Sequence, residues 1–269
     1  MPLAVEHIRR MRGGAQAHLV RCREESHEDA YYIVKFRNNP QHMRILVNEL
    51  LATRLARRLG LPAPLPAVVE VGPELIKGTE DLVMQLGRGR VPCEPGLQFG
   101  SRYPGDPVET VVFDFLPEEQ LAQVENLADF AGVLVLDKWT CNTNGRQAIF
   151  LRQPPRGRYQ ALMIDQGFCF NAGEWNFPDA PLRGLYARHH VYESVRSMES
   201  FEPWLDRLEH SMTESVLDEI ASEIPPEWYN FETDALYQLL EQLYQRRKRV
   251  PELLLDAKKS YRQPFPNWT

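Results

Sequence analysis

Three charged residues that are far apart in the sequence have the types needed to bind a polyphosphate. Lys35 lies near the end of the apolar segment YYIVKF (31–36), Glu49 lies in a stretch with helical periodicity, and Asp165 directly follows the apolar run ALMI (161–164). A carboxylate after a buried strand is costly unless it is paired or binds a metal ion. Phosphoryl transfer requires lysine and divalent cations to balance the charge of the phosphates, and carboxylates hold such cations. We therefore predict Asp165 as a magnesium ligand, Lys35 as a phosphate contact and Glu49 as its orienting partner.

A second group of polar residues lies in the segment LDKWTCNTNGRQ (136–147). Asp137 and Asn142 are separated by the spacing that kinases place between a catalytic aspartate and a metal-binding asparagine. If a helix ends near Cys141, both side chains lie on similar sides of it, and the Asp137 carboxylate would be free for an acceptor hydroxyl. The segment is thus a candidate catalytic loop.

Gly13 and Gly14 precede the strand-like segment HLVRC (18–22) in the sequence GGAQAHLV. In kinases a Gly-rich loop covers the phosphates of the nucleotide. Taken alone, a Gly-Gly pair is more often an ordinary turn, a strand lysine is more often an exposed edge residue, and a helix glutamate more often faces solvent. The order of these groups along the chain, rather than any single one, favours a phosphoryl-transfer site.

The elements that position these residues change in type along the chain. HLVRC and YYIVKF are typical of an antiparallel hairpin. The segment MRILVNELLATRLARRLG (43–60) has apolar residues at helical spacing, and Gly60 supplies a C-terminal cap. Further strands are predicted at PAVVEV (66–71), DLVMQL (81–86) and ETVVFDFL (109–116).

The Gly-, Pro- and Arg-rich segment 87–107 is predicted as a long loop. Helical patterns dominate from residue 118 onward and are interrupted by a strand pair, QAIFLR and YQALMID, that leads to Asp165. We therefore predict an α+β fold with two lobes, a β-rich N-lobe of residues 1–117 and a mostly helical C-lobe of residues 118–269.

With these motifs, the sequence resembles the HipA-like kinases, bacterial kinases related to the toxin HipA and more distantly to phosphatidylinositol kinases. The matching segments cover most of the chain and include GGAQAHLV, YYIVKFRNNPQ, NELLATRLARRLGLPAP, GLQFGSRYPGDP, LDKWTCNTNGRQAIF, MIDQGFCF and IPPEW. The resemblance implies a bilobal protein-kinase-like fold, ATP and Mg²⁺ as cofactors, and transfer of the γ-phosphoryl group to a serine or threonine hydroxyl of a protein. It further implies an ATP site formed by Gly13, Gly14, Gln16, Lys35 and Glu49, with Phe113 and Phe115 in the hinge beside adenine.

The sequence departs from this family in the catalytic loop. HipA-like loops usually contain Asp-Gly-His or Asp-Arg-His followed a few residues later by asparagine, and the matching segment here begins at Asn144. An amide cannot accept the proton of an attacking hydroxyl. Either Asp137 replaces the missing base, or the kinase is weakened or inactive. The resemblance implies Asp137, Asn144 and Arg146 as candidate catalytic residues, and Asp165, Asn142 and Gln147 as candidate metal ligands.

Three functions remain open at this point. The first is an active kinase, which Lys35, Glu49 and Asp165 together favour. The second is a pseudokinase that binds nucleotide or acts as a scaffold, which Asn144 favours. The third is nucleotidyl transfer, because related folds use one site for several reactions. A hydrolase is disfavoured, since the sequence has no G-x-S-x-G motif and Ser101 has no neighbouring histidine.

The composition limits the expected partners. The 269 residues carry a formal net charge of -6, which argues against a nucleic-acid partner. The basic runs RRMR (9–12) and RRKR (246–249) are interpreted as solvated helix faces, whereas Arg88, Arg90 and Arg102 could meet an anionic substrate or ATP phosphates. The sequence shows neither a signal peptide nor a membrane span, so we expect no membrane partner and a cytoplasmic location.

Overall fold

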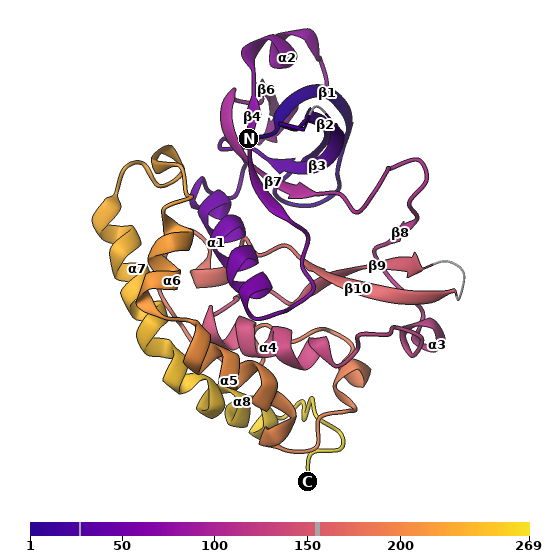
Figure 1. Ribbon diagram of the computed structural model, residues 1–269, viewed down its shortest axis with the longest axis vertical. Helices are drawn as coiled ribbons and strands as arrows, with labels where there is room; N and C mark the ends of the chain where they lie inside the picture. The colour runs from indigo at the N-terminus through magenta and orange to yellow at the C-terminus, as the bar shows by residue number, and fades with distance from the viewer. Residues whose placement is uncertain (27, 154–156) are drawn as a thin grey trace.

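The N-terminal strands close into a barrel at one end of the molecule, and the helices of the C-terminal half occupy the other end (Figure 1). The structure is a computed structural model that describes residues 1–26, 28–153 and 157–269. The barrel has the strand order β1-β2-β3-β7-β4, in which only the β1–β4 pair is parallel. Its strands are β1 (Leu3–Arg10), β2 (His18–Arg23), β3 (Asp29–Lys35), β4 (Pro66–Val71) and β7 (Gly96–Arg102).

Alternation along the barrel strands sets the direction of the functional lysine. In β3 the side chains of Ala30, Tyr32 and Val34 are buried in the barrel core. Because successive side chains of a strand point to opposite faces, Lys35 leaves the barrel core on the other side. The predicted hairpin of β2 and β3 is confirmed, with His18 opposite Val34.

Two expectations for the barrel were wrong. Residues 87–107 are not a loop, because they contain β6 (Gly89–Pro92) and all of β7. Gly100 in this segment serves close packing rather than flexibility, since a Cβ on it would lie 2.4 Å from Val69 and 3.1 Å from Tyr32. The RRMR run overlaps the end of strand β1, so it does not lie on a helix. β6 pairs with β5 (Val83–Leu86) in a separate hairpin.

A second sheet carries the strand that leads to Asp165. Its order is β10-β9-β8, with β8 (Val112–Phe113), β9 (Gln147–Gln153) and β10 (Arg158–Ile164) all antiparallel. The strand predicted over 109–116 is only two residues long in the structure. Val111 and Phe115 on either side of it are more than half exposed, so the apolar pattern of this segment does not mark a buried strand. Gln147 opposes Ile164, so the start of β9 lies beside Asp165.

Helix α1 shares one large hydrophobic core with the helices of the C-terminal half, whereas α2 packs on the core of the barrel. The bounds of the helices are α1 (Arg44–Arg58), α2 (Pro73–Gly78), α3 (Glu118–Leu121), α4 (Asp129–Trp139), α5 (Glu202–Ser211), α6 (Glu214–Ala221), α7 (Thr233–Arg246) and α8 (Val250–Lys259). Helix α1 ends as predicted, because Gly60 has a φ of 75° and its N–H donates to the carbonyl of Arg57. No helix in the described ranges is long and apolar enough to cross a bilayer.

Candidate active site

Lys35, Glu49 and Asp165 come from three segments and meet in the structure. The Lys35 ammonium donates hydrogen bonds to Glu49 Oε1 and, at 2.8 Å, to Asp165 Oδ1. The side chains of the three residues are 11%, 4% and 26% exposed, respectively. The ion pair predicted between Lys35 and Glu49 is thus present, and Asp165 is the most accessible member of the group.

The electrostatics of this group follow from burial and mutual charge. Burial opposes the charge on Lys35, but the carboxylates of Glu49 and Asp165 outweigh it and hold the pKa of Lys35 above its usual value. Burial likewise opposes ionisation of Asp165, yet the nearby ammonium of Lys35 keeps its pKa below the usual range. Burial dominates at Glu49, whose pKa is raised even though Lys35 lowers it. A charged lysine beside an ionised aspartate is therefore available at neutral pH.

The loop after Asp165 is fixed against helix α1. Asp165 adopts a left-handed backbone conformation with a φ of 61°, and the N–H of Gln166 donates to Glu49 Oε2 at 3.1 Å. A Cβ on Gly167 would lie 2.8 Å from Ile45 and 3.2 Å from Glu49 Oε1, so this close approach requires glycine. The conformation that presents the Asp165 carboxylate is thus imposed by the helix that carries Glu49.

Asn48 is a positioning residue that the sequence reasoning missed. Its fully buried amide donates to the carbonyls of Gly167, Cys169 and Ala172 at 2.8 to 3.0 Å, and its oxygen accepts the indole N–H of Trp175. An asparagine on the apolar face of a helix, three residues from both Ile45 and Leu51, was the available signal. Asn48 therefore ties α1 to the loop that follows Asp165.

We expect Asn48→Ala to lower the free energy of unfolding by about 2–4 kcal/mol, because three backbone carbonyls lose their donor. Asn48→Asp should cost more, since a carboxylate oxygen would face the three carbonyl oxygens. Chemical denaturation of both variants measures these losses. The control Arg54→Ala removes an exposed ion pair with Glu223 from the same helix and should cost less than about 1 kcal/mol. Equal stability of the aspartate variant and the wild type would contradict the role of Asn48.

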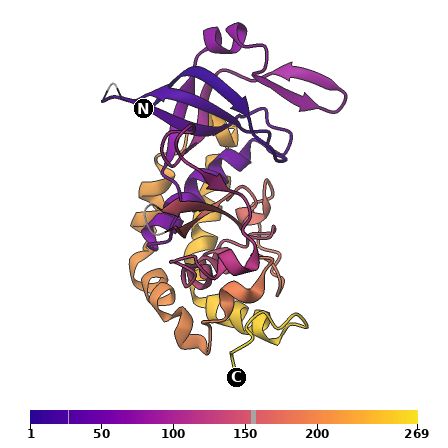
Figure 2. The ribbon, with the colours of Figure 1, turned by 90° about the vertical axis from the view of Figure 1, so that its right-hand side faces the viewer.

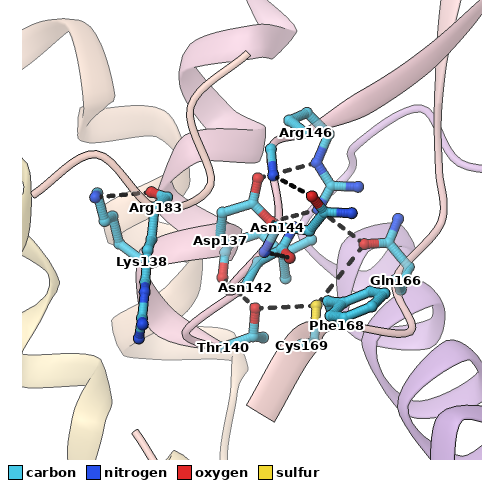
Figure 3. A network of polar contacts seen from close by, with 12 residues as sticks. Asp137, Lys138, Thr140, Asn142, Asn144, Arg146, Gln166, Phe168, Cys169 and Arg183 are labelled. Carbon is cyan, nitrogen blue, oxygen red and sulfur yellow. Dashed lines mark hydrogen bonds and ion pairs between the residues drawn. The ribbon is translucent and has the colours of Figure 1, made fainter. Parts of the chain in front are cut away.

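Asp137 and Arg146 form a buried ion pair in the candidate catalytic loop (Figure 3). Both side chains are fully buried, and the Arg146 guanidinium donates to both carboxylate oxygens of Asp137. The amide of Asn142 also donates to Asp137, at 3.0 Å. The expectation of a free Asp137 carboxylate is therefore wrong. The helix ends as expected, but the chain after it turns back and places Arg146 against the carboxylate.

Arg146 also fixes both neighbours of Asp165. It donates to the carbonyl of Ile164 and to the side-chain oxygen of Gln166, each at 2.9 Å. Only 3% of Arg146 is exposed, so it has no surface to offer a substrate. Arg146, which was predicted as catalytic, is instead placed to hold the backbone carbonyl of Ile164 and the side chain of Gln166, on either side of Asp165.

The other residues of this loop differ in accessibility. Asn142 is buried, and its side-chain oxygen accepts the N–H of Asn144, so metal coordination by Asn142 would require the loop to open. Asn144 is exposed. Gln147 is exposed and donates to Asp165 Oδ2 at 2.7 Å. Of the predicted loop residues, Gln147 is thus the one in contact with Asp165.

Lys138 anchors this loop from its other side. Its ammonium donates to the carbonyls of Ala180, Pro181 and Arg183 at distances of 2.8 to 3.3 Å. Burial lowers the pKa of Lys138 to about 8, even though nearby aspartates raise it. The segment held in this way continues to Gly184, whose N–H donates to the carbonyl of Asn144. Lys138 therefore binds backbone carbonyls in a structural role and is not part of the Lys35 group.

The Gly-rich turn lies between β1 and β2, at the end of the barrel where Lys35 lies. Gly13 has a φ of 122°, which favours glycine. A Cβ on Gly14 would lie 2.9 Å from the side chain of Gln41, so the turn approaches the residues before α1. The Gln16 amide, predicted to contact ATP, instead exchanges hydrogen bonds with the backbone of Gln85.

The two predicted hinge phenylalanines have different surroundings. Phe113 in β8 is partly buried and packs edge-on against Tyr159. Phe115 is 63% exposed, and the guanidinium of Arg188 lies over its ring at 4.7 Å from the centroid. Only Phe115 offers a largely open aromatic surface at this segment.

The residues present fit a metal ion that takes most of its ligands from a nucleotide. Within the described residues there is no group of three or more His, Cys, Asp or Glu side chains that could hold a metal. Asp165 offers carboxylate oxygens, and the adjacent Gln147 offers an amide oxygen. Mg²⁺ is often bound by one or two carboxylates together with phosphates and water, so this donor set suits it.

Comparisons with known proteins bear on the fold of the whole chain. The model of the family described as HipA-like kinase matches residues 4–253. No curated protein matches the sequence. Among solved structures, the Helicobacter pylori proinflammatory kinase CtkA has a TM-score of 0.59 at 14% identity, over 95% of this chain and 97% of that one.

Two further solved structures show the same fold. Hydra Fam20 with sugar has a TM-score of 0.57 at 13% identity, over 96% of this chain and 86% of that one. The Golgi casein kinase with Mn/ADP bound has a TM-score of 0.54 at 13% identity, over 97% of this chain and 74% of that one. At these identities the likeness establishes a kinase-like fold.

Proposed function

The chain belongs to the HipA-like kinase family, and from this premise we propose that it binds ATP with Mg²⁺ and transfers the γ-phosphoryl group to a serine or threonine hydroxyl of a protein. The observation that carries the proposal is the contact of Lys35 with both Glu49 and Asp165. These three groups come from β3, α1 and the residue that follows β10, and their side chains meet in one group of ion pairs. In this proposal the fold is bilobal, with an N-lobe of residues 1–117 and a C-lobe of residues 118–269.

Each member of the group has a distinct task in the proposed reaction. Lys35 exchanges its contact with Asp165 for the nucleotide phosphates, while Glu49 keeps the ammonium in place. Asp165, with Gln147 beside it, holds the divalent cation. The cation supplies positive charge that offsets the charge developing on the transferred group. Arg146 and Asn48 keep the backbone around Asp165 fixed, so little reorganisation is needed during transfer.

The acceptor hydroxyl meets an amide rather than a carboxylate base in this proposal. Asp137 is sealed by Arg146, and Asn144 is an exposed polar residue of the loop that makes no contact with Asp165 in the structure. Phosphoryl transfer depends mainly on positioning and charge stabilisation, with little covalent chemistry left to the protein. An amide that orients the hydroxyl by a hydrogen bond is therefore compatible with transfer, at a rate reduced by the missing base.

The direct test is the mass of protein acceptors after incubation with Mg²⁺ and ATP. We expect mass increases that correspond to phosphate, on serine or threonine, with the wild type and not with Asp165→Asn. A mass increase of a whole nucleotide would show nucleotidyl transfer and contradict the proposal. Absence of any product together with absence of a thermal shift by Mg²⁺ and ATP would contradict both catalysis and nucleotide binding.

A second candidate function is nucleotide binding without turnover. Two observations favour it: the amide of Asn144 at the loop surface and the complete enclosure of Asp137. In that case the Lys35 group still binds the nucleotide, and a thermal shift appears without product. Binding and product formation are therefore measured on the same preparation.

Asn144→Asp is expected to raise the rate of phosphoryl transfer about tenfold or more, because a positioned general base contributes about 10²- to 10⁴-fold in favourable cases. ADP release in the presence of Mg²⁺ and an acceptor mixture measures the change. Gln238→Glu on the exposed surface of α7 makes the same amide-to-carboxylate change as a control and should leave the rate unaltered. An unchanged rate in Asn144→Asp would mean that Asn144 does not face the acceptor.

A further inference from the structure

The Gly-rich turn and the β5–β6 hairpin are distant in sequence but are held side by side at the edge of the barrel. The Gln16 amide nitrogen donates to the carbonyl of Gln85 at 2.8 Å, and the N–H of Gln85 donates to the Gln16 side-chain oxygen at 2.7 Å. Gln16 belongs to the Gly-rich turn between β1 and β2, and Gln85 belongs to the β5–β6 hairpin. Figure 2 shows the turn and the hairpin on the same side of the barrel.

This junction gathers arginines from two segments of the N-terminal half. Arg10 and Arg12 precede the Gly-rich turn, while Arg88 and Arg90 lie at the tip and on the second strand of the hairpin, and all four are exposed. Arg10 also donates to the Gln16 side-chain oxygen. We call these four residues the arginine patch.

The arginine patch is poorly neutralised. Arg90 approaches Asp81 at 3.4 Å, but both side chains are more than half exposed, so the pair is weak. Arg12 and Arg88 have no ion pair with any residue in the part of the chain that the structure describes. The whole chain has a net charge of -6, so this local excess of positive charge runs against the overall balance. Unpaired guanidinium groups are suited to carboxylates and phosphates.

The patch adjoins the proposed reaction site. His18, directly after the Gly-rich turn, pairs with Val34, the residue before Lys35. The Gly-rich turn and the two arginines that precede it therefore lie at the same end of the barrel as Lys35. A substrate held on the patch would lie near the end of the barrel that carries the proposed reaction site.

We propose that the arginine patch docks an acidic segment of the protein substrate, so that the acceptor hydroxyl of an aspartate- or glutamate-rich sequence is brought to the site. This inference rests on the proposed function and adds its substrate class. Carboxylate groups on the substrate replace water around the guanidinium groups, which can bind them through two hydrogen bonds each. A nucleic acid fits less well, because nucleic-acid binders usually carry an overall basic excess and this chain has a net charge of -6.

The test uses the full chain and a fluorescently labelled, glutamate-rich peptide with one serine. We expect binding of this peptide that weakens between about 50 mM and about 300 mM salt, and no binding of the same peptide with glutamines. Arg12→Ala/Arg88→Ala should weaken binding about tenfold, since each exposed ion pair contributes up to about 1 kcal/mol and 1.4 kcal/mol is tenfold. The control Arg196→Ala/Arg262→Ala removes the same charge from exposed sites in the C-terminal half and should bind as the wild type.

Other outcomes separate this inference from the proposed function. Equal peptide binding by the patch variant and the wild type would overturn the docking surface, as would tighter binding of duplex DNA than of peptide. A patch variant that loses its thermal shift with Mg²⁺ and ATP would show that the arginines serve the nucleotide, which also overturns it. If the peptide binds through the patch while the wild type shows no shift with Mg²⁺ and ATP, the proposed function fails and the docking surface stands.

Discussion

A Lys35→Met variant is expected to lose phosphoryl transfer by at least about a hundredfold. Lys35 is the cation between Glu49 and Asp165, and a single preorganised charge or donor at a transition state is worth roughly 10²- to 10³-fold. ADP release and acceptor mass in the presence of Mg²⁺ and ATP measure the loss. Lys77→Met, at a side chain that is 75% exposed, is the matched control and should retain the wild-type rate.

The same variant should acquire a new pH dependence of stability. Burial already raises the pKa of Glu49 in the wild type, and loss of the Lys35 ammonium removes the main influence that lowers it. A folded-state pKa above the unfolded value means that the folded protein binds the proton more tightly, so this contribution is present at low pH and is lost as pH rises through the folded pKa. The free energy of unfolding of Lys35→Met should therefore fall between about pH 5 and about pH 8 more steeply than that of the wild type.

Two results would contradict this account of Lys35. One is wild-type turnover in Lys35→Met, which would place the phosphates elsewhere. The other is a loss of stability that is the same at both pH values, since an ionised Glu49 without a cation cannot remain buried at no cost. Urea unfolding followed by fluorescence at about pH 5 and about pH 8 gives the free energy of unfolding at each pH. A variant that has lost its fold shows no cooperative transition at either pH, which distinguishes it from a folded variant with the same loss at both.

Asp137→Asn is expected to lower the free energy of unfolding by about 3–5 kcal/mol. Arg146 would remain charged, because a guanidinium does not lose its proton in proteins, and it would be buried without a counter-charge. The neighbouring carboxylate already holds the pKa of Arg146 above its usual value despite burial. Denaturant unfolding measures the loss. A catalytic role of Asp137 would instead lower turnover and leave stability unchanged.

A double variant tests whether the loss comes from the unpaired charge. Asp137→Leu/Arg146→Met removes both charges and should be more stable than Asp137→Asn, because well-packed apolar pairs often replace buried ion pairs at little cost. Glu219→Gln breaks the exposed pair with Arg58, whose side chains are 47% and 59% exposed, and should cost less than about 1 kcal/mol. Equal losses for Glu219→Gln and Asp137→Asn would contradict the enclosure of Arg146.

Local pattern and residue order were sufficient to predict the elements that carry the Lys35 group. The β2–β3 hairpin, helix α1 with its Gly60 cap, and the β9–β10 pair before Asp165 were all predicted from periodicity and capping residues. Periodicity works in these places because each element buries one continuous face. Segment 87–107 was misread because glycine serves both turns and close strand packing, and only the neighbours of Gly100 distinguish the two.

The sequence by itself determined which residue types were available: a strand lysine, a helix glutamate, an aspartate after an apolar strand, and an asparagine where the resemblance predicts a catalytic aspartate. Only the tertiary structure decided their surroundings. The burial of Asp137 depends on Arg146 folding back across the loop, and the meeting of the two arginine runs depends on Gln16 and Gln85. Hydrophobic periodicity reports only the local structure of one element. It cannot reveal these contacts, because each depends on how whole elements pack against one another.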